Sequence, residues 1–347
     1  MSYDARPFLT ALYQRETSAR PAYIAVPPLT PIHQMPGYDF TISDQPVSAW
    51  VKPLVENYQM RLRYHEALGD DAVPLAKIGT GTHLYAAAFG CTVHRFENDN
   101  PCAVPCVLSV ADADKLTEPD IWSSPTLYRV FELARLVRDE LGPDVPLGPP
   151  DMQSGFDTAA LVWDKADFLC ALADPDTAPA ARRVIDICAR LFKRFITELY
   201  REFPGMSPCH CPSAWSPNLG PWLSNDECGA ISCAHFREFA LPELIDLAES
   251  FGGLGMHCCA DAEHQFDLFR TIPHFYAFNR VAAKRGYLPI LDTLGGPDGP
   301  VHVLQWISNE QIRELRTQAP AGTRFIFCHD VTSVDEGRVW LEQMRAS

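Results

Sequence analysis

From about residue 70 onward, short apolar runs that end in Gly, Pro or a polar residue alternate with longer amphipathic segments. This alternation is typical of repeated β-α units built around a parallel sheet. A (β/α)8 barrel takes roughly 200 to 400 residues as one domain, and the chain has 347. The sequence therefore predicts an α/β protein with a single TIM barrel over residues 45–347. An irregular, proline-rich arm over residues 1–44 precedes it.

The same pattern gives approximate bounds for the individual elements. We expect helices at 46–68, 176–203, 233–251, 261–272 and 334–345, and strands at 253–259, 275–277, 287–290, 301–306 and 324–328. The helix at 176–203 has the clearest signal, because its apolar residues recur at three- and four-residue spacing: Val184, Cys188, Leu191, Phe195 and Leu199. Pro242 should kink the helix over 233–251, since proline cannot donate the helical hydrogen bond.

The charge balance limits the classes of partner. The chain carries 29 basic and 44 acidic side chains, a formal net charge of -15. Such a protein repels polyphosphates and anionic lipid head groups at long range. We therefore expect neither nucleic acid nor a membrane as a partner.

The 12 cysteines bear on the compartment. The start of the sequence lacks the pattern of a secretory signal, and no run approaches 18 uninterrupted apolar residues. We therefore expect a cytoplasmic protein, where cysteines serve as small buried hydrophobes or metal ligands more often than as disulfides.

Two clusters of potential metal ligands each follow an apolar run. His257-Cys258-Cys259 ends one run, and Cys328-His329-Asp330 ends another. On a strand, His257 and Cys259 leave the same face and Cys258 leaves the other. Imidazole and thiolate are ligands that Zn²⁺ prefers, and strand ends form the active-site face of a barrel. We therefore expect His257, Cys259 and Cys328 to hold zinc with one position open, the alternative being an interior histidine with packing cysteines.

Other polar residues near these clusters have weaker cases. Asp226 and Glu227 could supply an oxygen ligand or accept a proton, although a loop carboxylate pair is more often simply solvated. Asp330 could orient a ligand histidine or only cap the next helix. Cys209 and Cys211 could be ligands, a thiol pair lining the cavity, or loop packing, and we favour the cavity wall.

The chain resembles the uroporphyrinogen decarboxylase superfamily, and in particular its branch of zinc-dependent methyltransferases that work with corrinoid proteins. The segments that carry the resemblance are Gly148-Pro149-Pro150-Asp151, Asp167-Phe168-Leu169, Asp174-Pro175, the run from His235 to Pro242, and Met256-His257-Cys258-Cys259. The resemblance implies a (β/α)8 barrel. It also implies that zinc is held by a His-x-Cys pair and a late cysteine, roles that fall on His257, Cys259 and Cys328.

This resemblance implies a methyl transfer between a corrinoid (cobalamin) on a partner protein and a small thiol, or a similar acceptor, bound to zinc. Trp215, Trp222 and Phe278 would line the approach of the corrinoid, with core packing as the alternative for each. Two other functions stay open: a decarboxylase (a lyase) acting on a tetrapyrrole, which would need concentrated positive charge, and a non-catalytic zinc protein with a saturated site.

Overall fold

The computed structural model describes residues 3–16, 20–31, 34, 46–97, 99–281 and 285–346. Within these residues, the strands of the barrel are β1 (Ala22–Val26), β2 (Ala76–Lys77), β5 (Leu147–Gly148), β6 (Trp222–Ser224), β7 (Leu254–Cys258), β8 (Phe275–Arg280), β9 (Val301–Leu304) and β10 (Arg324–Asp330). Six of them form a parallel sheet in the order β1-β10-β9-β8-β7-β6, and β2 pairs with β5 in parallel. A parallel bridge between Gln153 and Ser224 connects the β5 side to β6. The predicted TIM barrel is confirmed.

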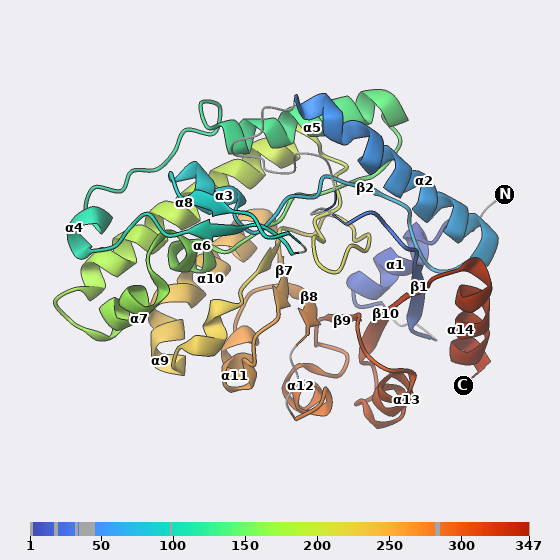
Figure 1. The fold of residues 1–347 in the computed structure, drawn as a ribbon. Helices are drawn as coiled ribbons and strands as arrows, with labels where there is room; N and C mark the ends of the chain where they lie inside the picture. The colour runs from blue at the N-terminus through green and yellow to red at the C-terminus, as the bar shows by residue number, and fades with distance from the viewer. Residues whose placement is uncertain are drawn as a thin grey trace.

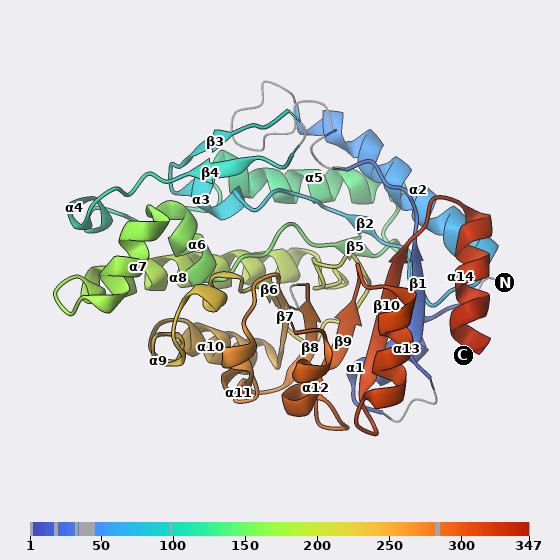
Figure 2. The ribbon, with the colours of Figure 1, turned by 60° about the horizontal axis from the view of Figure 1, so that its bottom comes forward.

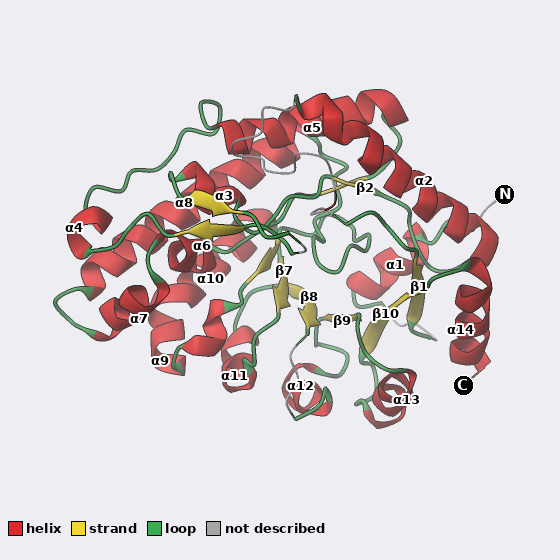
Figure 3. Cartoon of the chain, viewed as in Figure 1, coloured by secondary structure: helices red, strands yellow, loops and turns green. Residues whose placement is uncertain are grey.

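Helices form the outer layer around these strands (Figures 1 and 3). The longer ones are α2 (Val51–Leu68), α5 (Pro125–Leu141), α8 (Ala178–Glu202), α10 (Leu241–Phe251), α13 (Asn309–Gln318) and α14 (Val334–Ala346). Shorter helices are α3 (Leu84–Ala88), α4 (Val110–Ala113), α6 (Gly155–Val162), α7 (Lys165–Ala173), α9 (Cys233–His235), α11 (Phe266–Phe269) and α12 (Leu288–Leu294). Figure 2 shows the antiparallel hairpin of β3 (Thr92–His94) and β4 (Cys102–Val104) near α3, apart from the six-stranded sheet.

Alternation along the strands divides the core into two layers. On β10, Phe325 and Phe327 belong to the cluster packed under the helices, whereas Ile326 and Cys328 belong to a cluster inside the barrel. This is the period of two expected of a strand. Helix α1 (Arg6–Tyr13) closes the amino-terminal end of the barrel, because its buried apolar residues join the interior cluster.

Carboxylates close the seam between β1 and β2. Asp71 accepts a hydrogen bond from the Tyr23 backbone N–H at 2.9 Å, and Asp70 accepts one from the Ala25 N–H at 2.9 Å. The Asp71 backbone N–H in turn donates to the Tyr23 carbonyl at 3.0 Å. On the side of β1 that faces β2, side chains therefore supply the hydrogen-bond partners that β2 does not provide. The other side of β1 pairs with β10.

Most predicted elements are present, with three differences. Ala22–Val26, within the predicted irregular arm, is the barrel strand β1; residues 35–45 of that arm lie outside the described residues. Residues 287–290, predicted as a strand, begin helix α12. The predicted helix at 261–272 is shorter, a 3-10 turn (Glu263–Gln265) followed by α11.

The predicted disturbance at Pro242 takes the form of a π-helical turn, Phe236–Ala240, directly before α10. Proline lacks the N–H that would continue the α-helical hydrogen bonds, and a wider turn accommodates this loss. In the described part of the chain, no helix has both the length and the apolar character needed to cross a bilayer.

Candidate functional site

The carboxyl ends of β6 and β7 bring together the ligands predicted on β7. His257 lies in β7, and Cys259 follows the end of the strand. Cys258 points the other way, into the outer core, where its sulfur lies 3.8 Å from the sulfur of Cys228. The alternation expected from the sequence therefore places His257 and Cys259 on one face, at the end of the barrel where active sites form.

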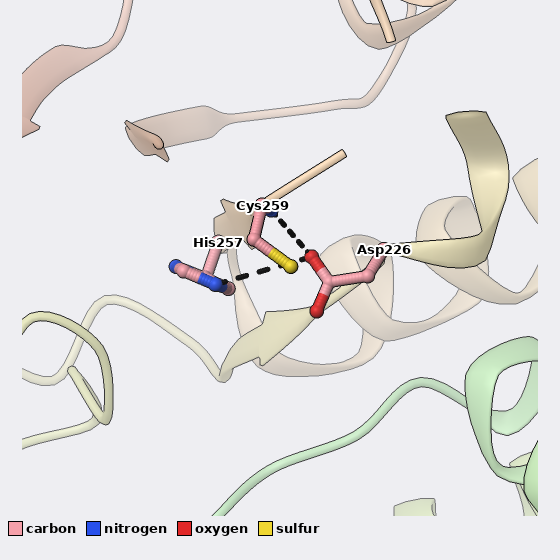
Figure 4. A group of neighbouring side chains, drawn as sticks. All are labelled: Asp226, His257 and Cys259. Carbon is pink, nitrogen blue, oxygen red and sulfur yellow. Dashed lines mark hydrogen bonds and ion pairs between the residues drawn. The ribbon is translucent and has the colours of Figure 1, made fainter. Parts of the chain in front are cut away.

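Asp226, in the loop after β6, completes a group of three (Figure 4). One ligand atom from each of Asp226, His257 and Cys259 lies within 4.8 Å of the other two. The Asp226 Oδ1 atom accepts a hydrogen bond from the Cys259 backbone N–H at 2.5 Å and lies 3.9 Å from His257 Nε2. Imidazole, thiol and carboxylate thus face a common point.

Asn279, on the neighbouring strand β8, fixes the ring of His257. It stands opposite His257 in the β7–β8 register, and its Oδ1 lies 2.5 Å from His257 Nδ1. The Asn279 amide nitrogen donates to the Val303 carbonyl at 2.6 Å, so its oxygen must face the imidazole. His257 therefore donates through Nδ1–H, and its Nε2 is the nitrogen that faces Asp226 and Cys259.

The charges around the group favour a cation. Burial alone would lower the pKa of His257, but the neighbouring Cys211 and Cys259 sulfurs and the Asp226 carboxylate outweigh it and raise that pKa well above its usual value. Contact with His257 lowers the pKa of Cys259, yet burial and Asp226 together give a net increase. A metal ion would replace the protons that these groups otherwise hold.

A buried carboxylate holds the Asp226 loop. Asp157 accepts hydrogen bonds from the backbone N–H groups of Asp226 at 2.6 Å and Glu227 at 3.0 Å. The side chain of Glu227 forms an ion pair with Lys165 at 2.6 Å, outside the group of three. Of the two predicted acidic residues, the structure places Asp226 at the site.

Cys328 is not part of the group among the described residues. It lies on β10 and faces the barrel interior in the cluster that contains Ile24 and Ile326. Burial, with a smaller effect of Asp330, raises the pKa of its thiol. The role of Cys328 as third ligand stays a prediction, and Asp226 takes the third place in the arrangement observed.

Asp330, predicted to orient a histidine, contacts a different side chain. Its Oδ1 accepts a hydrogen bond from Gln305 Nε2 at 2.7 Å. The polar atom that contacts Nδ1 of His257 is the side-chain oxygen of Asn279 instead. Sequence reasoning missed Asn279 because an asparagine inside an apolar strand carries no ligand signature; its position opposite His257 follows only from the strand register.

The three aromatic residues predicted to line a corrinoid approach lie elsewhere. Trp222 is fully buried inside the barrel against Tyr276, and Phe278 is fully buried among phenylalanines on the helix side of β8. Trp215 packs at the edge of the interior cluster and lines a separate pocket with Phe203 and Arg138. The structure thus favours packing, because no side of Trp222 or Phe278 reaches solvent.

A cavity of about 430 Å³ reaches His210 and Cys211, two neighbours of His257, but none of the group of three lines it. His210 and Cys211 form part of its wall, as predicted for Cys211, and the ring centre of His210 lies 6.0 Å from that of His257. Cys209 is buried and donates to the Pro212 carbonyl at 3.0 Å. Sequence reasoning also missed two cations in the cavity wall, Arg61 and Lys77.

The donor set fits a zinc ion. Ligands about 2.0 to 2.3 Å from a tetrahedral zinc lie roughly 3.5 Å apart, so the three atoms would need only a small contraction. Nitrogen, sulfur and oxygen ligands are all common for zinc. The group thus lies at the end of the barrel where barrel enzymes carry their active sites.

Comparison with known proteins agrees with the fold. Residues 58–202 match the family model described as uroporphyrinogen decarboxylase (URO-D). A solved structure of a methyltransferase from Methanosarcina mazei is similar with a TM-score of 0.65 and 14% sequence identity, and the match covers 99% of each chain. No curated protein matches the sequence. The predicted resemblance to the uroporphyrinogen decarboxylase superfamily is confirmed, and the likeness to the solved structure shows the shared barrel fold.

Proposed function

We propose that this protein is a zinc-dependent methyltransferase that moves a methyl group between a corrinoid (cobalamin) carrier and a small thiol or similar acceptor. The observation that carries the proposal is the convergence of His257, Cys259 and Asp226 beside a cavity at the carboxyl end of the barrel. The structural likeness to the methyltransferase from Methanosarcina mazei and the match to the uroporphyrinogen decarboxylase family are consistent with it. The corrinoid would be presented by a partner protein over the barrel mouth.

His257 and Cys259 are the proposed zinc ligands, with Asp226 or Cys328 as the third. Bound zinc would act as a Lewis acid that holds the acceptor thiol as a thiolate, the competent nucleophile, at neutral pH. Asn279 keeps the Nε2 lone pair of His257 available for the ion. The partly enclosed cavity next to His210 and Cys211 would hold the acceptor.

Replacing Cys259 by Ala should remove zinc and thiol methylation together, because each thiolate contributes heavily to the affinity of such a site. Elemental analysis of the purified protein and methyl transfer from methylcobalamin to a thiol measure the two effects. Cys258→Ala is the matched control, since its side chain points into the core and should leave zinc bound. Methyl transfer that persists in Cys259→Ala would contradict the mechanism.

X-ray absorption at the zinc edge can identify the third ligand. Two sulfur donors that fall to one in Cys328→Ala would place Cys328 at the metal. A single sulfur donor, unchanged in that variant, would leave Asp226 as the third ligand.

A tetrapyrrole decarboxylase is the second candidate, because Arg61 and Lys77 place positive charge in the barrel mouth. Two cations are few for a substrate with eight carboxylates, which makes methyl transfer the better-supported function. If the zinc-free protein decarboxylates uroporphyrinogen, decarboxylation becomes the better-supported function.

A further inference from the structure

Two cysteines meet at the base of the β3–β4 hairpin, the one visible near α3 in Figure 2. Cys91 directly precedes β3, and Cys106 lies two residues after the end of β4. Their sulfur atoms are 3.4 Å apart, and both carry free thiols. A further approach of roughly 1.4 Å would bring the two sulfurs to the disulfide bond length of about 2.05 Å.

Backbone hydrogen bonds hold both cysteines against the body of the protein. The Cys91 N–H donates to the Ala86 carbonyl in α3 at 3.2 Å, and the Cys106 N–H donates to the Val162 carbonyl at the end of α6 at 3.0 Å. Groups that are already fixed side by side lose little conformational freedom when they are joined. The fold therefore supplies the proximity that disulfide formation requires.

The two thiols differ in their access to solvent. Cys91 is buried, with 4% of its surface exposed, whereas Cys106 is exposed. Another close sulfur pair, Cys228 and Cys258 at 3.8 Å, is buried on both sides. A small oxidant can therefore reach the pair at the hairpin through Cys106, while Cys91 waits behind it.

The contact between the sulfurs also activates the exposed one. The Cys91 thiol donates to Cys106 and lowers the pKa of Cys106 to about 7, although burial and the carboxylate of Asp112 oppose this decrease. The same contact, together with burial, raises the pKa of Cys91. The thiolate is the form of cysteine that attacks peroxides and disulfides. Cys106 is thus the attacking sulfur at neutral pH, and Cys91 stays protonated until it is needed.

We propose that Cys91 and Cys106 form a redox-active dithiol that hydroperoxides convert into a reversible disulfide. The Cys106 thiolate attacks one oxygen of hydrogen peroxide and the O–O bond breaks. The released hydroxide takes up the proton that Cys106 gave up, and Cys106 becomes a sulfenic acid. The Cys91 sulfur then attacks the Cys106 sulfur, the S–O bond breaks, and a second water leaves with the Cys91 proton. The two sulfurs together lose two electrons, and the peroxide is reduced to two waters.

The disulfide would fasten the hairpin where it joins the barrel. Between β3 and β4, the side chain of Phe96 is 49% exposed, and Asn100 lies in the wall of the cavity that reaches His210. The two cysteines are 15 positions apart, and closing a loop of this size removes conformational freedom from the open form of the hairpin. Oxidation therefore holds this part of the cavity wall more firmly. The inference does not depend on zinc binding or methyl transfer.

The reaction can be tested on the reduced full-length protein with equimolar hydrogen peroxide as the probe. Blocking of the remaining thiols, digestion and mass spectrometry should show a peptide pair joined through Cys91 and Cys106. Dithiothreitol should release this link. The buried pair of Cys228 and Cys258 is the internal control and should remain reduced, because peroxide does not reach it.

Variants separate the two steps. Cys91→Ala should stop at the sulfenic acid of Cys106, which dimedone captures, and Cys106→Ala should give neither product. Cys102→Ala is the matched control, since Cys102 is a partly exposed cysteine on β4 of the same hairpin; it should form the disulfide as the wild type does. Circular dichroism checks folding, and the exposed Cys106→Ala carries the test if Cys91→Ala does not fold.

Trypsin cleavage after Arg95, between the two cysteines, measures the restraint on the hairpin. Cleavage should slow at least about tenfold on oxidation of the wild type and should not respond to peroxide in Cys106→Ala. Unchanged cleavage in the oxidised wild type would refute the restraint. Absence of the link in the wild type, a link from Cys106 to Cys102 instead, or equal oxidation of the buried control pair would overturn the inference as a whole.

Discussion

The tautomer of His257 depends on one amide on the neighbouring strand. Asn279 is held by the Val303 carbonyl and presents its oxygen to His257 Nδ1. This contact leaves Nε2 available to a metal ion without any change of ring orientation. A histidine without such a partner would have to be ordered when the ion binds, which lowers the affinity.

Asn279→Ala should therefore weaken zinc binding by about 10- to 100-fold, the usual effect of losing a partner of a ligand histidine. Competition with a chromophoric chelator measures the affinity. Asn279→Asp should bind zinc more tightly than Asn279→Ala, since a carboxylate still accepts from Nδ1–H, although it can no longer donate to the Val303 carbonyl. Unchanged affinity in the alanine variant would mean that Asn279 does not position His257.

The sequence identified part of this site for a clear reason. His257 and Cys259 have the residue types and the two-residue spacing of strand-borne metal ligands, and Asp226 belongs to an acidic pair that could supply an oxygen ligand. Asn279, Arg61 and Lys77 have no such signature. Their place at the site is decided by strand register and by the closure of the barrel, which no local pattern reveals.

At the scale of elements, periodicity predicted long segments better than short ones. The stripe along α8 is buried as expected. Residues 287–290 were predicted as a strand because a short apolar run does not distinguish strand from helix. Pro289 lies in the first turn of α12, and Ile290, Leu291 and Leu294 are its buried face, so the spacing only becomes helical when residues beyond 290 are included.

Glu243 joins two helices through a buried carboxylate. From the first turn of α10, it accepts hydrogen bonds from the backbone N–H groups of Gly155 at 2.6 Å and Phe156 at 3.3 Å, at the start of α6. Burial raises its pKa from 4.5 to about 7, and the two backbone hydrogen bonds only partly oppose this. Between these values, the unfolded chain releases the proton while the folded one retains it.

The contribution of Glu243 to stability should therefore decrease as pH rises from 5 to 8, by roughly 3 kcal/mol. Glu243→Gln has no proton to release and should lose less free energy of unfolding than the wild type over this range. Urea denaturation at several pH values measures the difference. Glu249→Gln is the control, because Glu249 is exposed on the same helix; its free energy of unfolding should change with pH as that of the wild type does. If Glu243→Gln shows the same pH dependence as the wild type, Glu243 does not titrate as described.

At the scale of the whole molecule, the barrel is closed by an aspartate pair between β1 and β2. Asp71 is fully buried and receives both Arg20 Nη1 and Nη2 at 2.7 Å, in addition to the Tyr23 N–H. The alternation of apolar runs predicted the barrel, but not that β1 lies in the proline-rich arm. A five-residue strand whose partners are the last strand and two side chains has no local signal.

Asp71→Ala should lower the free energy of unfolding by about 2 to 4 kcal/mol, because it leaves the buried Tyr23 N–H without its acceptor and removes the ion pair with Arg20. Chemical denaturation gives the value. Asp335→Ala, which removes an exposed carboxylate paired with Arg338, should change stability by less than about 1 kcal/mol. A similar small loss in Asp71→Ala would show that the seam does not depend on this residue.

The pairing of β1 with β10 also sets the order of events during synthesis. A ribosome releases β1 about 300 residues before β10, so the growing chain cannot complete its ring until its final strand emerges. Until then the edge of β1 lacks its partner and is exposed to other nascent chains. A translation product that stops before Arg324 should therefore aggregate or be degraded instead of persisting as a smaller folded protein.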